Sequence, residues 1–168
     1  MDYIKNGRPL FCLIVALIAL QYMGGAYLRN TFWRHDLILW NDVAALSPAK
    51  ARGHINLGTA FTRIGGYDVA LEKFFIALEL DPFSPEAHNN IGAAYSLKGL
   101  FDEAIGHYEN ALRLRPGYPD AYNNLGVTYE KKGMIEDAIK NYQSALKINP
   151  RYNKAENNLT RLQAGRIR

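Results

Sequence analysis

Cysteine is almost absent from this sequence, since Cys12 is the only one among 168 residues. One cysteine excludes an internal disulfide and any metal site built from several cysteines. An excess of one sign of charge is also missing, because the net charge is only +4. Lysine and arginine form no run along the chain. Without a basic patch, nucleic acid is not expected as a partner.

The residue patterns of common catalytic sites are missing as well. The four histidines never form a closely spaced pair in the sequence, so no metal site is predicted from them. Glycine does not form a phosphate-binding loop, and no serine lies in a nucleophile elbow. We therefore expect that the chain is not an enzyme and holds no cofactor and no metal.

One long apolar run does occur, near the N-terminus. Residues 9–28 carry no charge over 20 residues. At about 1.5 Å per residue, a helix of this length crosses a hydrocarbon core about 30 Å thick. We predict a single-pass membrane protein in which residues 1–8 form a short tail and residues 9–28 form a transmembrane helix in the lipid bilayer.

The orientation of that helix rests on a small difference in positive charge. Lys5 and Arg8 precede it, and Arg29 and Arg34 follow it. The α-amino group adds one more positive charge to the tail, and positive flanks favour the cytoplasm. We therefore expect the rest of the chain on the periplasmic or lumenal side.

A cleaved signal peptide is the alternative interpretation of the same segment. A basic start, an apolar core and the small residues 24–26 fit that pattern. Cleavage there would release a secreted soluble protein. The apolar density continues past this point into Tyr27 and Leu28, which favours the uncleaved anchor.

Beyond the anchor, one short stretch recurs with a fixed spacing. It contains Leu or Ile followed by glycine, and its glycines Gly58, Gly92 and Gly126 are evenly spaced. Their period of about 34 residues lies in the range of roughly 20 to 50 that predicts a solenoid, in which each unit packs on its neighbours. Each unit divides into two helical segments, because a glycine suits the residue that closes a helix and a proline cannot continue one.

The predicted architecture is therefore all-α. The repeats span residues 51–84, 85–118 and 119–152, and residues 153–168 form a capping helix and a tail. Small residues recur where two helices come close, and large aromatic residues recur between them. Residues 29–50 form a juxtamembrane helix, which is either a lone helix or the second half of a degenerate first repeat.

The same residues carry a resemblance to a known family. Leu-Gly, Tyr or Phe, Gly, Ala, Tyr or Phe, Ala and Pro at these offsets resemble the tetratricopeptide repeat over about Ala51 to Leu162. This resemblance implies a right-handed superhelix of paired antiparallel helices that binds protein partners. His54 and His88 stand where the family has a bulky aromatic residue, so we interpret both as packing residues.

Asparagine is the polar residue that recurs with the repeat. The family resemblance implies that the first helix of each repeat lines the concave surface, where an amide can both donate to and accept from a peptide backbone. The pattern resembles the asparagine ladder in the repeat domain of O-GlcNAc transferase, which implies peptide binding. Contacts between neighbouring repeats, or a solvated helix face, are the alternative. The candidate binding residues are Asn56, Asn89, Asn90, Asn123, Asn124, Asn157 and Asn158.

These features together predict a membrane-anchored adaptor for protein–protein interaction. We expect its partner to be a protein or peptide, and its role to be that of an accessory or assembly subunit of a membrane complex. A second interpretation comes from residues 29–48, which resemble the segment that joins the last membrane helix to the repeats in polytopic glycosyltransferase-like proteins. The chain would then be a recruiting or regulatory part of such an enzyme.

Overall fold

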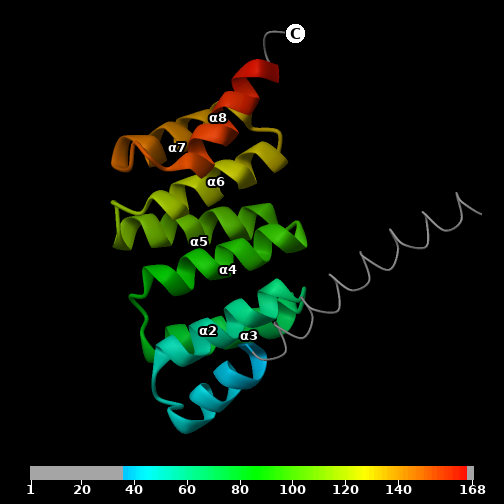
Figure 1. Ribbon diagram of the computed structural model, residues 1–168, viewed down its shortest axis with the longest axis vertical. Helices are drawn as coiled ribbons and strands as arrows, with labels where there is room; N and C mark the ends of the chain where they lie inside the picture. The colour runs from blue at the N-terminus through cyan, green and yellow to red at the C-terminus, as the bar shows by residue number, and fades with distance from the viewer. Residues whose placement is uncertain (1–35, 166–168) are drawn as a thin grey trace, which may run out of the picture. The chain divides into compact units, whose positions relative to one another are not determined.

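The computed structural model describes residues 36–165, in which all regular structure is helical. The chain divides into two units between residues 39 and 40, and the helices labelled in Figure 1 belong to the second. Figure 1 shows the helices of the second unit stacked in chain order. They are α2 (Ala51–Arg63), α3 (Tyr67–Leu80), α4 (Pro85–Lys98), α5 (Phe101–Leu114), α6 (Pro119–Lys131), α7 (Ile135–Ile148) and α8 (Asn153–Gly165).

The helices form pairs with the predicted period. We call α2, α4 and α6 the A helices and α3, α5 and α7 the B helices, and α8 follows α7 as a further A helix. Each helix packs on the next one, and each A helix also contacts the following A helix. The all-α class and the alternation of helix and turn predicted from the sequence are confirmed for this part of the chain.

Glycine ends each A helix by adopting a backbone conformation that other residues avoid. Gly65, Gly99 and Gly133 have φ angles of 82°, 81° and 83°. Such a residue lets the next backbone N–H reach back to an unpaired carbonyl of the last helical turn. The N–H of Leu100, for example, donates to the carbonyl of Tyr95 at 3.0 Å. This turn reverses the chain so that helix B packs against helix A.

A second set of glycines lies at the crossing of the paired helices. A Cβ atom added to Gly92 would lie 2.8 Å from the ring of Tyr108 and 3.0 Å from the carbonyl oxygen of Ala104. Gly58 and Gly126 face Phe74 and Tyr142 in the same way. No side chain fits there, because real Cβ contacts are longer than these. The prediction that small residues allow close approach is confirmed.

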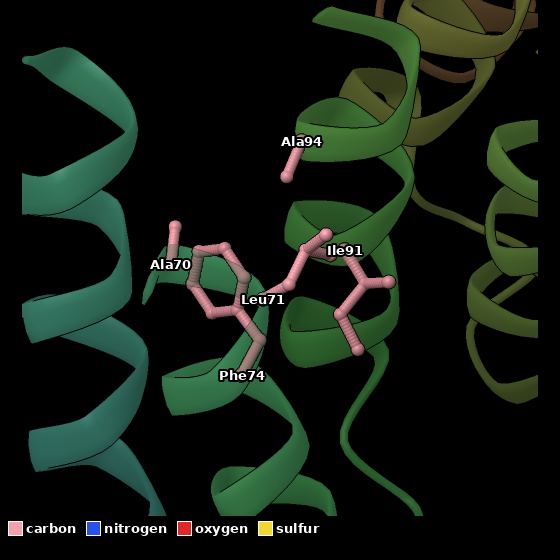
Figure 2. Packing of buried hydrophobic residues seen from close by; sticks show 5 residues of the cluster. All are labelled: Ala70, Leu71, Phe74, Ile91 and Ala94. Carbon is pink, nitrogen blue, oxygen red and sulfur yellow. The ribbon is translucent and has the colours of Figure 1, made fainter. Parts of the chain in front are cut away.

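The core follows the stack rather than filling one central volume. Figure 2 shows one segment of it, where Phe74 and Leu71 of α3 pack against Ile91 of α4. Similar clusters surround Tyr108 and Tyr142, and all three aromatic side chains are at most 2% exposed. Each cluster joins one repeat to the next, so removing a large aromatic residue would weaken both the pair and the stack.

The residues just before α2 extend this packing. Residues 36–46 are helical, and Ala44 is buried against α2, with its Cα 3.4 Å from the position of a Cβ on Gly53. Gly53 stands one period before the buried Ala87, at the equivalent place. The helix also ends one period before the end of α3. These relations agree with a degenerate repeat, whose first half would lie outside the described residues.

The predicted membrane segment is not part of the described structure. Residues 1–8 and 9–28 both lie outside residues 36–165. Within those described residues, every helix is too short or too polar to cross a membrane.

Candidate functional site

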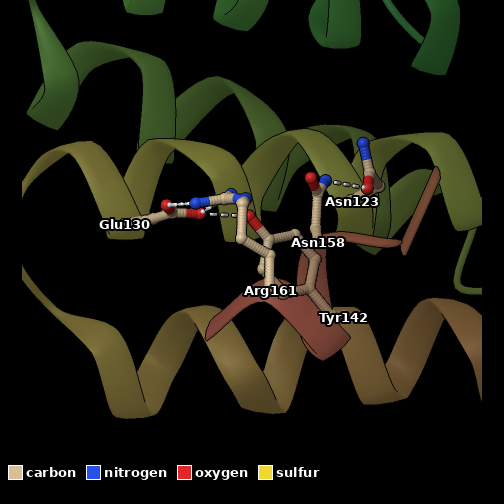
Figure 3. Close-up of polar contacts among 5 residues, drawn as sticks. All are labelled: Asn123, Glu130, Tyr142, Asn158 and Arg161. Carbon is tan, nitrogen blue, oxygen red and sulfur yellow. Dashed lines mark hydrogen bonds and ion pairs between the residues drawn. The ribbon is translucent and has the colours of Figure 1, made fainter. Parts of the chain in front are cut away.

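The asparagines of the A helices form pairs that join one repeat to the next. The amide nitrogen of Asn124 donates to the side-chain oxygen of Asn89 at 3.1 Å, and that of Asn158 donates to Asn123 at 3.1 Å. Figure 3 shows the second pair between α6 and α8. Asn89 and Asn123 are each only 6% exposed. These four residues therefore make contacts between neighbouring repeats, as one of the two interpretations of the sequence stated.

The other three asparagines lie outside these pairs. The position that would pair with Asn90 is Ile55, so Asn90 donates instead to the hydroxyl of Thr59 at 3.4 Å. Asn56 is half-buried and borders a hollow of about 380 Å³ beside the start of α4. Asn157 is exposed on α8. A role in ligand binding stays a prediction for all seven candidate asparagines.

Two hollows of equal size lie between consecutive A helices. The first, about 180 Å³, lies between α2 and α4 and is lined by Thr59, Thr62, Arg63, Phe74, Asn90 and Ala93. The second, also about 180 Å³, lies between α4 and α6 and is lined by Ala93, Ser96, Leu97, Tyr108, Asn124, Val127 and Lys131. Most of these positions correspond when they are shifted by one period. We call the surface that carries both hollows the A-helix face.

The equivalent place between α6 and α8 is occupied by an ion pair. Arg161 donates to both carboxylate oxygens of Glu130, at 2.6 and 2.8 Å, and the hydroxyl of Tyr142 donates to the same group at 3.0 Å. These contacts are visible in Figure 3. The hydrogen bonds from Arg161 lower the pKa of the Glu130 carboxyl, so this group is ionised at neutral pH.

A buried hydroxyl pair adds a further polar contact beneath the second hollow. Thr128 is fully buried, and its Oγ1 lies 3.0 Å from the Oγ of Ser96 on the previous A helix. Neither this pair nor the contact between Arg161 and Glu130 was predicted from the sequence. The spacing of the repeat could have indicated the place of Arg161, because this residue stands one period after Val127, which lines the second hollow.

The family of the chain follows from these repeats. One family model, described as tetratricopeptide repeat, matches residues 119–152, and another, described as TPR repeat, matches residues 97–133. The chain is a tetratricopeptide-repeat protein. No curated protein sequence matches it.

Solved structures share the same fold. A tetratricopeptide-repeat protein of Thermus thermophilus, TTC0263, matches with a TM-score of 0.75 at 21% identity, over 82% of this chain and 76% of that one. The crystal structure of MamA matches with a TM-score of 0.66 at 26% identity, over 77% of this chain and 76% of that one.

A third structure is the first repeat domain of Spaghetti (RPAP3) bound to an HSP90 peptide. It matches with a TM-score of 0.66 at 25% identity, over 71% of this chain and 94% of that one. The repeats and these relatives together indicate an adaptor for protein–protein interaction.

Proposed function

We propose that this chain is a membrane-anchored adaptor that holds an extended segment of another protein along its A-helix face. The two hollows between the A helices carry this proposal. They repeat with the period of the fold and are separated by one helix, so successive side chains of one extended peptide can occupy both. The likeness to a repeat domain solved with a peptide supports the same mode of binding.

The lining of the hollows indicates the chemistry of the ligand. Aromatic rings of Phe74 and Tyr108 contribute to the two floors, and Asn90 and Asn124 stand at their edges. An apolar side chain would pack against each ring, while an amide at the edge would bond to the peptide backbone. The basic residues at the rim, Arg63 and Lys131, give no strong preference for a highly charged ligand.

The anchor supplies the second half of the proposed mechanism. Residues 9–28 are uncharged over 20 residues, and a transmembrane helix there would keep the repeats beside the bilayer. A tethered binding site raises the effective concentration of a membrane partner, so that weak contacts suffice for capture. The proposed role is that of an accessory or assembly subunit of a membrane complex, with the repeats on the periplasmic or lumenal side.

Peptide selection tests the binding half of the proposal. Peptides that bind the full chain would be selected from a random library, and their affinity would then be measured for Ala93→Leu, which fills both hollows from the shared residue. We expect at least a tenfold loss. Gln143→Leu, at an exposed site on α7, is the matched control and should bind normally. Equal affinity for both variants would remove the A-helix face as the site.

Membrane fractionation with intact-mass measurement tests the anchor. The full-length mass in a carbonate-resistant membrane fraction is expected. A soluble species that begins near residue 27 would contradict the anchor and favour the secreted alternative. Protease protection of the repeats in sealed vesicles would then report on which side of the membrane they lie.

A further inference from the structure

Two histidines that are far apart in the sequence meet in the second repeat. The Nδ1 atom of His88 on α4 lies 3.2 Å from the Nδ1 atom of His107 on α5. Their ring centroids are 5.4 Å apart. In the other repeats the corresponding pairs are His54 with Lys73 and Tyr122 with Asn141, so this juxtaposition of two imidazoles occurs once among the three repeats.

We propose that His88 and His107 form a two-imidazole binding site for a divalent transition-metal ion of the Zn²⁺ or Cu²⁺ type. Two nitrogen ligands bound to one tetrahedral Zn²⁺ at about 2.0–2.1 Å are about 3.3 Å apart. The distance of 3.2 Å between the two Nδ1 atoms matches this value. Metal binding would replace the hydrogen bond between the two Nδ1 atoms. The donor ring would carry its proton on Nε2 instead, and a small rotation of each ring would turn both Nδ1 lone pairs toward a shared ion.

The surroundings of the pair hold the rings in place. The backbone carbonyl of Pro82 raises the pKa of His88, and Pro82 stands one period after Pro48, whose carbonyl bonds to Nε2 of His54 at 3.0 Å. A bond from Nε2 of His88 to the Pro82 carbonyl would leave the lone pair on Nδ1, which is how a carbonyl commonly orients a metal-binding histidine. The ring of His107 packs against Tyr95, at 5.6 Å between centroids, and against the edge of Phe75 at 6.1 Å.

Charge and burial define which ions can bind. Burial lowers the pKa of both histidines, and the nearby Arg113 lowers that of His88 further, which keeps the rings neutral at pH 7. Arg113 also opposes a bound cation, so only ions with high affinity for imidazole would bind, in contrast to Mg²⁺ or Ca²⁺.

Two protein ligands leave coordination positions of the ion open. In the described part of the chain, no group of three or more histidine, cysteine, aspartate or glutamate residues is placed to hold a metal ion. The open positions would take water or a side chain of a bound partner. The metal would also join α4 to α5, so we expect it to raise the melting temperature of the protein.

Zinc titration of the untagged full-length chain tests the site. The repeats themselves provide variants with native-like side chains: His88→Tyr and His107→Asn introduce the residues of the third repeat, and His54→Tyr is the matched control. Calorimetry should show Zn²⁺ binding by the native chain and by His54→Tyr. Each of the other two variants should lose at least tenfold in affinity, with unchanged helicity by circular dichroism.

Copper provides a spectroscopic check of the two ligands. Electron paramagnetic resonance of the Cu²⁺ complex should show coupling to two imidazole nitrogens in the native chain, and to one at most in either variant. Equal Zn²⁺ affinity in all four proteins, no binding by the native chain, or a single coupled nitrogen would each overturn the proposal. None of these results depends on peptide binding by the A-helix face.

Discussion

The side-chain amide of Asn124 donates to that of Asn89 across the boundary between the second and third repeats, at 3.1 Å. Asn158 and Asn123 repeat this bond at the next boundary with the same length. In each bond, the second asparagine of an A helix donates to the first asparagine of the previous A helix. The two bonded residues are therefore separated by one residue more than the period. The recurring Asn-Asn sequence thus contributes to the stacking of the repeats.

Replacing Asn124 with alanine should destabilise the fold because it leaves the amide oxygen of the buried Asn89 without its donor. The expected loss is about 1–3 kcal/mol in the free energy of unfolding. Urea denaturation of Asn89→Ala, Asn124→Ala and the double variant should give a coupling energy of about 0.5–1.5 kcal/mol. Asn157→Ala, at an exposed position, should change stability by less than about 0.5 kcal/mol. Additive losses would show that the hydrogen bond contributes nothing.

Replacing glycine with alanine should have opposite effects at two places in the second repeat. Gly92→Ala puts a methyl group 2.8 Å from Tyr108 and should cost about 1–3 kcal/mol by overpacking. Gly106→Ala lies within α5 with open space around its Cβ, so lower backbone entropy should stabilise the fold by about 0.5–1 kcal/mol. Thermal denaturation measures both. If both substitutions changed the stability in the same direction, the packing described at the helix crossing would be contradicted.

The ion pair of Glu130 and Arg161 should make stability depend on pH in the acidic range. Because folding lowers the pKa of Glu130, the unfolded chain binds more protons, and stability rises with pH near the unfolded pKa of about 4.3. At pH 7 the free energy of unfolding of the native chain should be about 0.5–1 kcal/mol larger than that of Glu130→Gln. This difference should vanish as the pH falls below the pKa of Glu130 in the folded protein. Glu103→Gln, at an exposed site on α5, is the control. A difference that persists at pH 2.5 would refute the assignment.

Exchanging the residues of this ion pair for those of the previous repeat should extend the binding face. Glu130→Ser together with Arg161→Val introduces the residues found at Ser96 and Val127. The double variant would have a third hollow between α6 and α8, because the bidentate contact that occupies this place is removed. Peptides lengthened beyond the second hollow should bind this variant more tightly than the native chain, as measured by fluorescence anisotropy. Short peptides should bind both equally.

Much of the architecture could be predicted from single residues and their spacing. The glycine at each turn and the proline at the start of α4 and α6 specify local backbone geometry, so the alternation of helix and turn followed from the sequence. Gly92 and the buried alanines beside it recur because close helix crossing excludes larger side chains. These are local or strictly periodic requirements, which one sequence can express.

The polar contacts could not be predicted in the same way. Asn89 and Asn124 carry the same side chain as the exposed Asn157, and their different roles depend on which helix stacks above them. The interpretation of these residues as a peptide ladder and their interpretation as repeat contacts were therefore both compatible with the spacing. Burial and neighbours show which asparagines contact the next repeat, and both are properties of the assembled stack.

The sequence alone determined the period of the repeat and the division of each repeat into two helices. Only the tertiary structure showed that Asn124 bonds to Asn89, that Arg161 occupies the third position of the A-helix face, and that His88 faces His107. The physical reason is that turns and caps depend on neighbours along the chain. Contacts between side chains depend on how one helix is offset and rotated against another, which no short stretch of sequence specifies.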